Sequence, residues 1–380
     1  MVILHIVSNL TTGGAELMLK RLAAHHAGDD RFTHAVVSLR EKATVGPQLE
    51  ALGVSVEALG LAGARGMPRV LGQLRQRIRG VNPDIVQTWM YHADLLGGIA
   101  ARLAGVRHII WGVRTTDIAL AGVPRSTLLT RRICARLSRT VPERILYVGE
   151  AARSVHERLG YDPGKAVVIQ NGYSVPALAA VAAARAARRA ELNLDAGAVL
   201  VGAAGRFSAE KGYDMFIAAA ERIAARHGQA RFVLIGRDVT WDNPELVRWI
   251  RASGLEDRFV LLGEQRRIHE WLAAVDVFVL SSLYEGFPNI VAEAMSVCTP
   301  CVVTDVGDAA LLIGDSGILV PAGDLDGLAR GVSTMIEEGE DARRSRGGAA
   351  RTRVEDRFSI EAIARRYEDL YLATVSRTDA

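Results

Sequence analysis

Short runs of apolar residues recur along the whole chain, and longer segments with apolar residues at helical spacing separate them. Most of these runs are apolar at consecutive positions, which indicates strands that are covered on both faces. Such strands alternating with helices predict parallel sheets of the α/β class. Twelve runs are expected to be strands: residues 2–8, 34–39, 84–89, 108–113, 144–149, 166–171, 199–205, 231–236, 258–263, 276–282, 300–305 and 317–320.

The strand count and the chain length favour two domains. A chain of 380 residues is too long for one ordinary core. The runs fit two doubly wound sheets of about six strands each better than one eight-stranded barrel. Residues 173–195 contain no strand run and carry an Ala- and Arg-rich stretch, so the boundary is expected there. We therefore expect Rossmann-like domains at 1–175 and 195–355, followed by a C-terminal segment at 356–380.

The C-terminal segment carries a helical pattern over residues 359–375, with Ser359 as a candidate N-cap. Six residues form its apolar stripe: Ile360, Ile363, Ala364, Tyr367, Leu370 and Tyr371. We expect this helix to brace the two domains.

The composition, 49% apolar and 23% charged residues, is that of a soluble globular protein. No apolar run approaches the ~20 residues that cross a bilayer. The first residues, MVILHIVSNL, lack the basic region and cleavage site of a signal peptide, so we predict a cytoplasmic protein. Three cysteines suit a reducing compartment. Cys298 and Cys301 form a C-x-x-C that closes a helix instead of opening one, which indicates packed thiols and not a redox motif.

Charge is distributed unevenly along the chain. Residues 1–170 hold 22 lysines and arginines against 13 acidic residues, whereas the remaining 210 residues hold 24 against 30. A basic first half beside an acidic second half suggests that the first half meets an anionic surface or substrate.

Ligands of open parallel sheets bind at the carboxyl ends of strands, and three segments have this placement. In the first, Gly13 and Gly14 follow the first strand and Glu16 opens a helix. Two glycines let a backbone approach a ligand closely, and the helix start offers N–H groups to an anion. A tight turn without any ligand explains the same pair equally well.

The second segment is GRFSAEKG, residues 205–212, between a strand and an amphipathic helix. Arg206 and Lys211 flank this loop, where two cations can clamp a diphosphate. The alternative is a solvated loop with ordinary basic residues.

The third segment is SSLYEGFPNIVAEAM, residues 281–295, which places Glu285 in a loop and Pro288 in the first turn of a helix. Glu293 then falls in the second turn. These acidic residues can simply compensate the helix dipole. They can also accept bonds from the hydroxyls at the two ends of a nucleotide sugar, while amides near Asn289 and Ile290 hold phosphate.

Together these segments carry a resemblance. The chain is similar over essentially its whole length to retaining glycosyltransferases of family 4, also described as glycosyl transferases group 1. GGAE at 13–16, GRFSAEKG at 205–212 and Glu285-x7-Glu293 occur in the order of that family's motifs. The resemblance implies the GT-B fold, in which two Rossmann-like domains face each other across a cleft. It also implies transfer of a sugar from a nucleotide-diphosphate donor.

The resemblance assigns roles in the second domain by position. Arg206 and Lys211 would neutralise the departing diphosphate. Glu285 would orient the transferred sugar and stabilise positive charge at its anomeric carbon, and Glu293 would bind the ribose. Gly263, within LGEQR at 262–266, would lie near the base.

In the first domain, Gly13 and Gly14 would contact the phosphates when the domains close. Many relatives carry a histidine after the strand that corresponds to HIIWGV, where this chain has Arg114. Arg114 could fill that place, and His92 is the nearer candidate for a polar contact of the first domain with the reacting sugar. The alternative is that His92 caps a helix that starts at Asp94.

We expect no metal site and no cofactor besides the donor substrate. Asp324 and Asp326 form an Asp-x-Asp, but PAGDLDGLARGV is typical of a helix start with an acidic cap. If Arg206, Lys211 and the helix dipole neutralise the leaving group, no metal is needed.

The segment 125–144 suggests the acceptor, because Leu129, Ile133 and Leu137 share one helical stripe amid arginines. Such a face can lie on an anionic membrane, although the stripe can equally pack inside the protein. A glycan or lipid-linked acceptor at the inner membrane surface would suit an enzyme of cell-surface polysaccharide biosynthesis.

Other functions stay open on the sequence alone. A sugar-nucleotide epimerase or a phosphorylase would use the same architecture, and an inactive homologue could act as a partner protein. A dehydrogenase is disfavoured because G-x-G-x-x-G follows none of the strands. Nucleic-acid binding is disfavoured because basic residues and aromatics are not interleaved.

Overall fold

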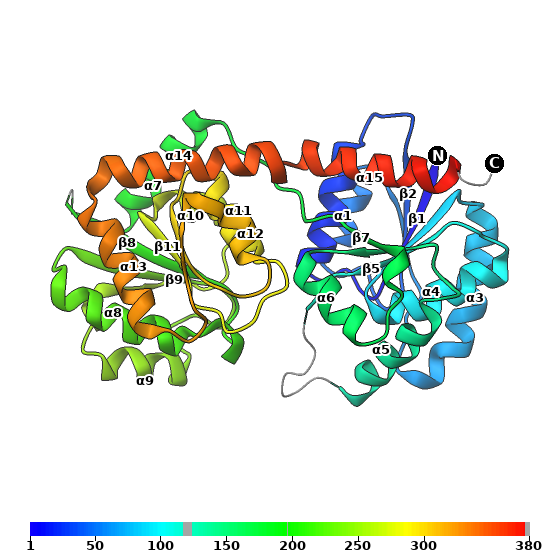
Figure 1. Cartoon of the computed structure of the whole chain (residues 1–380), viewed down its shortest axis with the longest axis horizontal. Coiled ribbons are helices and arrows are strands. Elements are labelled where there is room, and N and C mark those ends of the chain that lie inside the picture. The colour runs from blue at the N-terminus through cyan, green and yellow to red at the C-terminus, as the bar shows by residue number, and fades with distance from the viewer. Residues whose placement is uncertain (117–123, 196, 377–380) are drawn as a thin grey trace. The chain divides into compact units, whose positions relative to one another are not determined.

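The computed structural model describes residues 1–116, 124–195 and 197–376, and the last four residues of the predicted C-terminal segment lie outside this part. The chain divides into two compact units (Figure 1). Unit 1 is Met1–Gly172 together with the chain from Ile360 onward, and unit 2 is Tyr173–Ser359.

Unit 1 contains one parallel seven-stranded sheet with the order β3-β2-β1-β4-β5-β6-β7. Its strands are β1 (Val2–Val7), β2 (Thr33–Ser38), β3 (Ser55–Ala58), β4 (Ile85–Trp89), β5 (Ile109–Val113), β6 (Arg144–Tyr147) and β7 (Ala166–Val168). Six of them were predicted. The sequence pattern missed β3, because Ser55 and Glu57 break the apolar run at this edge strand, where Ser55 is exposed.

The helices of unit 1 flank this sheet. They are α1 (Gly14–His25), α2 (Gly46–Glu50), α3 (Met67–Val81), α4 (Tyr91–Ala104), α5 (Arg125–Leu137), α6 (Glu150–Arg158) and α15 (Ile360–Val375). All six residues of the apolar stripe predicted for α15 are buried, so that pattern is confirmed. The helix starts directly after Ser359, and it packs against α1 in a core shared with β1 and β4.

Unit 2 contains a parallel six-stranded sheet with the order β10-β9-β8-β11-β12-β13. Its strands are β8 (Val199–Ala204), β9 (Ala230–Ile235), β10 (Phe259–Leu261), β11 (Val277–Leu280), β12 (Cys301–Thr304) and β13 (Ile318–Val320). All six were predicted. Its core holds Phe216, Phe232 and Phe259, whose rings lie against one another, and burying each contributes about 1.5–3 kcal/mol.

The helices of unit 2 are α7 (Leu178–Glu191), α8 (Tyr213–Arg226), α9 (Pro244–Ala252), α10 (Ile268–Ala274), α11 (Asn289–Ser296), α12 (Ala309–Ile313), α13 (Leu325–Glu337) and α14 (Gly339–Phe358). The Ala- and Arg-rich stretch forms α7, which packs against α10. Arg189 Nη1 lies 2.8 Å from Asp276 Oδ2, and Arg185 donates to the other oxygen of the same buried carboxylate. The arginines of this stretch therefore fasten α7 to the sheet of unit 2.

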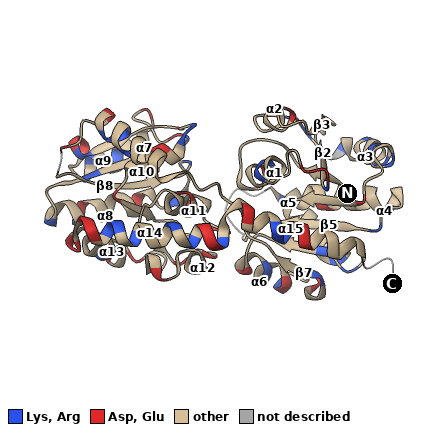
Figure 2. Cartoon of the chain, turned by 90° about the horizontal axis from the view of Figure 1, so that it is seen from above, with Lys and Arg blue, Asp and Glu red and all other residues tan. Residues whose placement is uncertain are grey.

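Two local predictions can be compared with the structure. Asp324 is the N-cap of α13, since its carboxylate accepts a hydrogen bond from the Gly327 amide at 2.8 Å. The acidic-cap interpretation of Asp324-Leu-Asp326 is thus confirmed. Cys298 and Cys301 are unbridged thiols, and Cys301 is buried. Charge is mixed on the helices of unit 2, with acidic and basic residues together on α13 and α14 (Figure 2).

In both sheets the first three strands are added in turn towards one edge, and the next strand is added on the other side of the first. The reversal lies between β1 and β4 in unit 1 and between β8 and β11 in unit 2. Ligands of such sheets bind beyond the carboxyl ends of the strands at this reversal. The loops after β8 and β11 leave from neighbouring strands, so the second and third predicted segments meet at one edge.

Candidate active site

Glycines join the carboxyl ends of three strands in unit 2. Gly236 follows β9 with a φ of 152°, and a Cβ on it would lie 1.7 Å from the carbonyl oxygen of Gly205, which follows β8. The Gly236 amide donates to the Gly263 carbonyl after β10 at 2.8 Å. Only glycine at position 236 permits this backbone contact. Gly263, predicted near the base, therefore lies beside the loop that carries Arg206.

A second glycine fixes the Arg206–Lys211 loop on β11. Gly212 has a φ of 60°, and a Cβ there would meet the Ser281 carbonyl oxygen at 2.3 Å. The Ser281 hydroxyl donates to the Lys211 carbonyl at 2.9 Å, and the Leu283 amide donates to the Glu210 carbonyl at 2.8 Å. This contact brings the predicted second and third segments together.

Lys211 and Glu285 form an ion pair at this junction. Lys211 Nζ lies 2.6 Å from Glu285 Oε1, and the Ser282 hydroxyl donates to the same oxygen at 2.8 Å. The two charged side chains are only 20% and 13% exposed, so water screens their attraction weakly. The pair places one cation and one carboxylate together where a ligand of this sheet would bind.

Arg206 does not join that pair. Its side chain is 67% exposed, and its Nη2 lies 3.0 Å from Glu210 Oε1. Partial burial would raise the pKa of Glu210, but the hydrogen bond from Arg206 and those from the backbone and Ser208 outweigh it and lower the pKa. Arg206 thus lies at the surface of the loop beside an ionised carboxylate. The sequence pattern did not identify Glu210 as its partner.

Helix α11 starts at Asn289 and Pro288 is its N-cap, so Pro288 lies directly before the first turn and not within it as predicted. The Asn289 side chain accepts a hydrogen bond from the Tyr173 hydroxyl. Ile290 follows in the first turn, where backbone amides have no acceptor within the helix. Glu293 lies in the second turn, as predicted, and only 8% of the residue is exposed.

The loop after β12 supports the loop that carries Glu285. Gly307 has a φ of 55°, and a Cβ on it would lie 2.4 Å from the Gly286 carbonyl oxygen. The Asp308 amide donates to that same oxygen at 3.2 Å. The backbone around Glu285 is therefore held from two sides, by β8's loop and by this turn.

In unit 1, Gly13 and Gly14 lie at the start of α1. Gly13 is extended, with a φ of −157°, so its backbone does not require glycine. A Cβ there would approach the Glu16 carboxylate to 2.5 Å. Burial raises the pKa of Glu16, while a backbone hydrogen bond and the charge of Arg114 oppose the rise. Contact of the two glycines with a phosphate stays a prediction.

His92 is the second residue of α4, which starts at Tyr91. The alternative that His92 caps a helix starting at Asp94 is therefore wrong. The helix starts three residues earlier than Asp94, and its N-cap is Met90, which has a φ of 73°. The ring is half-buried, and burial, with a smaller effect of Arg40, lowers the pKa of His92.

Arg114 follows β5 and is held at the same edge of unit 1. Its guanidinium donates to the Asn171 side chain and lies 5.2 Å from the ring centroid of Trp89, at the end of β4. The sequence pattern did not single out Trp89 or Asn171. Trp89 ends β4 and Asn171 follows β7, and this position at the carboxyl ends of strands could have identified both as candidates.

Two family models match the chain. The model described as Glycosyltransferase Family 4 matches residues 12–175, and the model described as Glycosyl transferases group 1 matches residues 198–338. The chain belongs to these glycosyltransferases. The resemblance inferred from the three motifs is confirmed.

Curated relatives of this glycosyltransferase include three bacterial enzymes. The N-acetyl-alpha-D-glucosaminyl L-malate synthase of Bacillus anthracis is 33% identical over 37% of this chain and 37% of its own. The lipopolysaccharide core biosynthesis mannosyltransferase LpsB of Rhizobium meliloti is 31% identical over 47% of this chain and 54% of its own. The UDP-Gal:alpha-D-GlcNAc-diphosphoundecaprenol alpha-1,3-galactosyltransferase of Escherichia coli is 27% identical over 77% of this chain and 76% of its own. The first two alignments thus span about a third to a half of those enzymes.

Solved structures with the same fold cover nearly all of the chain. Anabaena Alr3699/HepE in complex with UDP has a TM-score of 0.84 at 22% identity, over 98% of this chain and 100% of that one. A glycosyltransferase from Rickettsia africae has a TM-score of 0.82 at 15% identity, over 98% of each chain. These likenesses establish the GT-B architecture of two Rossmann-like domains, as predicted.

Proposed function

We propose that this glycosyltransferase moves a sugar from a nucleotide-diphosphate donor to a glycan or lipid-linked acceptor, with retention of anomeric configuration and without a metal ion. The observation that supports this most directly is the ion pair between Lys211 and Glu285 at the carboxyl ends of β8 and β11. It provides a cation for a leaving diphosphate and a carboxylate for a sugar at the strand ends where ligands of this fold bind.

The chemistry follows from where charge develops. As the bond between the anomeric carbon and the phosphate oxygen breaks, negative charge grows on the diphosphate, which Lys211 and Arg206 neutralise. Positive charge grows on the anomeric carbon, which the Glu285 carboxylate stabilises. The acceptor hydroxyl attacks from the face that the diphosphate leaves, and a phosphate oxygen takes its proton. Retention then needs no nucleophile from the protein.

Names of similar proteins support a nucleotide sugar as donor. The Escherichia coli relative is named for UDP-Gal, and an Anabaena Alr3699/HepE structure contains UDP-glucose. Glu293 would bind the ribose of such a donor, the amides of Asn289 and Ile290 its phosphate, and Gly263 would lie near the base. His92 in unit 1 would contact the reacting sugar.

The acceptor side of the proposal concerns α5. Leu129 is 58% exposed, and Arg125, Arg132 and Arg136 on the same helix are also exposed. Of the predicted stripe, Leu129 is thus not packed inside the protein, whereas Ile133 and Leu137 are partly buried. The exposed Leu129 among arginines supports peripheral contact with an anionic membrane. Among the described helices, none has the length and apolarity to cross a bilayer. Names of relatives include lipopolysaccharide core enzymes and one with a diphosphoundecaprenol acceptor, which supports a role in cell-surface polysaccharide biosynthesis at the cytoplasmic membrane face.

A thermal-shift panel of UDP, GDP and ADP with their sugars tests the donor site. We expect one nucleotide series to raise the melting temperature, because a ligand that binds only the folded protein stabilises it increasingly as its concentration exceeds Kd. Adding a chelator should not change this shift. Incubation of the stabilising donor with and without acceptor glycans then separates transfer from epimerisation, which changes the donor without an acceptor. A third incubation with added inorganic phosphate detects phosphorolysis, which forms a sugar phosphate. Absence of stabilisation by every nucleotide sugar would contradict the proposal.

A further inference from the structure

Unit 1 contains a chain of three buried histidines outside the site described above. His5 on β1 faces His34 on β2, with 2.8 Å between His5 Nε2 and His34 Nδ1. His34 Nε2 in turn lies 2.8 Å from Nδ1 of His26, which follows α1. The chain ends on α15, because His26 Nε2 lies 3.2 Å from Glu368 Oε1.

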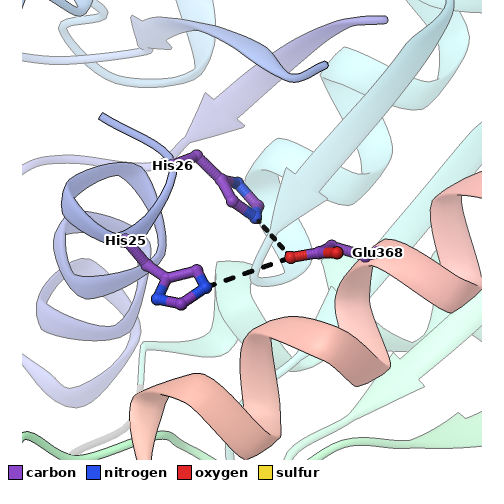
Figure 3. Close-up of side chains that lie close together, drawn as sticks. All are labelled: His25, His26 and Glu368. Atoms are coloured by element: carbon purple, nitrogen blue, oxygen red, sulfur yellow. Dashed lines mark hydrogen bonds and ion pairs between the residues drawn. The ribbon is translucent and has the colours of Figure 1, made fainter. Parts of the chain in front are cut away.

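At this end of the chain, three side chains converge on one point (Figure 3). Besides His26, the neighbouring His25 places its Nε2 4.0 Å from the same Glu368 Oε1. The three ligand atoms all lie within 4.8 Å of one another. A tetrahedral Zn²⁺ with bonds of about 2.0–2.1 Å holds its ligand atoms roughly 3.4 Å apart. Two imidazoles and one carboxylate are a common ligand set of this ion, and a fourth position stays open to water.

The atoms behind these ligands have the arrangement of an outer metal shell. Ligating carboxylates are usually hydrogen-bonded through their other oxygen, and ligating imidazoles through their other nitrogen. Arg31 Nη2 lies 3.4 Å from Glu368 Oε2, while His34 engages Nδ1 of His26. The Arg31 charge is itself balanced by Asp29, at 2.7 Å. These contacts leave Oε1 as the carboxylate oxygen that faces both histidine rings.

We propose that His25, His26 and Glu368 form a binding site for a divalent transition-metal ion of the Zn²⁺ type that fastens α15 to the end of α1. The site lies apart from Gly13 and Gly14, because the twelve residues of α1 separate its two ends by about 17 Å. The ion is a structural one that joins two helices of unit 1, and sugar transfer does not pass through it. His26 is 342 residues from Glu368 in the sequence, so the spacing of residues alone could not reveal the site.

Metal binding has a consequence at the other end of the histidine chain. The indole N–H of Trp89 donates to His5 Nδ1 at 3.2 Å, so in the metal-free chain each ring carries its proton on Nε2 and donates toward Glu368. A metal on His26 Nε2 moves the proton of that ring to Nδ1, and the following rings must reverse as well. His5 Nδ1–H then faces the Trp89 N–H, which is an unfavourable contact of two donors. Trp89 therefore weakens metal binding.

Cobalt titration of the full chain tests the site. Bound Co²⁺ gives the visible absorption of tetrahedral coordination, and Zn²⁺ should displace it. We expect His25→Ala and Glu368→Gln each to weaken Co²⁺ binding at least tenfold. Glu361→Gln, at an exposed position of the same helix, should leave it unchanged. Because the His25 side chain is 27% exposed, His25→Ala should fold normally even if Glu368→Gln does not.

The direction of the hydrogen bonds along the three histidines supplies a second measurement. Trp89→Phe removes the opposing donor, so Co²⁺ should bind roughly three- to tenfold more tightly to this variant. Nitrogen NMR of the imidazoles should show protons on Nε2 before Zn²⁺ is added and on Nδ1 of His26 afterwards. Failure to bind Co²⁺ at micromolar concentration, equal binding by His25→Ala and Glu361→Gln, or an unchanged His26 tautomer would each overturn the proposal.

Discussion

The ammonium of Lys211 lies 2.6 Å from the carboxylate of Glu285, although 74 residues separate them in the chain. The contact depends on backbone that only glycine allows, because Gly212 packs on the Ser281 carbonyl and places the loop after β8 directly on the end of β11. A bound diphosphate would compete for the same ammonium. In the proposed reaction Lys211 therefore exchanges a carboxylate partner for a phosphate one as the donor binds.

Replacing Lys211 with Ala should lower kcat by about 10²–10³, the cost of removing one preorganised group that stabilises developing negative charge. Donor affinity should fall much less, since the leaving group carries more negative charge in the transition state than in the intact bound donor. Steady-state kinetics and isothermal titration with the intact nucleotide sugar, without acceptor, measure the two effects.

Arg237→Ala is the matched control for Lys211→Ala. Arg237 also follows a strand of the unit 2 sheet, but it pairs with Glu264 at 3.3 Å and is 58% exposed. Its removal should leave kcat within about twofold, as for most exposed ion pairs. Equal losses of kcat and donor affinity in Lys211→Ala would contradict a role in the transition state.

The sequence predicted the fold well because buried parallel strands have an unmistakable pattern of consecutive apolar residues. Twelve of the strands follow it, and β3 does not because its edge position tolerates Ser55 and Glu57. The apolar stripe of α15 was equally clear, because both of its ends pack on a core. Where a helix began was less predictable: α4 starts at Tyr91 after an N-cap, Met90, with a positive φ, which no residue pattern indicated.

For the site, the sequence supplied the segments but not their partners. Position after a strand identified Lys211 and Glu285, and the strand order then explains why they meet. The pairing of Arg206 with Glu210 could not be predicted, because a surface arginine has several acidic neighbours to choose from. The histidine chain was not predicted for another reason: His5, His26 and His34 come from separate parts of the sequence that the fold brings together, and the packing of α15 adds Glu368.

Gly212→Ala should destabilise unit 2. The φ of 60° is costly for alanine, and the added Cβ would lie 2.3 Å from the Ser281 carbonyl oxygen. Strain of this kind costs about 1–3 kcal/mol, before any shift of the Ser281 backbone. Gly228→Ala is the control, since it has open space around a Cβ and an ordinary φ, and it should change the free energy of unfolding little or raise it. Urea unfolding followed by circular dichroism measures both, and similar values for the two variants would contradict this account of Gly212.

Asp94 makes stability depend on pH. The carboxyl is fully buried, and burial raises its pKa to about 7, against the opposing hydrogen bonds from Thr88 and the Gly112 amide. The unfolded carboxyl ionises near its ordinary pKa of 3.8, whereas the folded one stays protonated up to about pH 7. The folded state therefore binds the extra proton between these values, and this contribution to stability falls as pH rises through that window, by up to about 4 kcal/mol.

Asp94→Asn isolates that contribution, because asparagine retains an oxygen that can accept from Thr88 and Gly112. Urea unfolding of both proteins between about pH 4.5 and 7, which lies between the unfolded and folded pKa values of Asp94, should show the wild type losing stability relative to the variant as pH rises. His156, whose pKa burial lowers to about 4, acts in the opposite direction but equally in both proteins. Parallel pH profiles would show that Asp94 is ionised in the folded protein.

The exposed face of α5 predicts how the protein meets membranes. Replacing Arg132 and Arg136 with Glu reverses two exposed charges, and since each basic residue near an anionic surface contributes about 1 kcal/mol, membrane affinity should fall more than tenfold. Leu129→Ser should weaken binding to a smaller extent, because it removes one apolar contact and leaves the charge unchanged. Co-sedimentation with vesicles that contain 30% or so anionic lipid measures the affinity, with neutral vesicles as reference. The control is Arg248→Glu together with Arg251→Glu, which reverses two exposed charges on α9 of unit 2 and should have little effect. If anionic lipid merely attracted the net positive charge of the protein, both pairs of substitutions would lower membrane affinity alike. An equal loss of affinity in the α5 and α9 variants would therefore refute a membrane contact through α5.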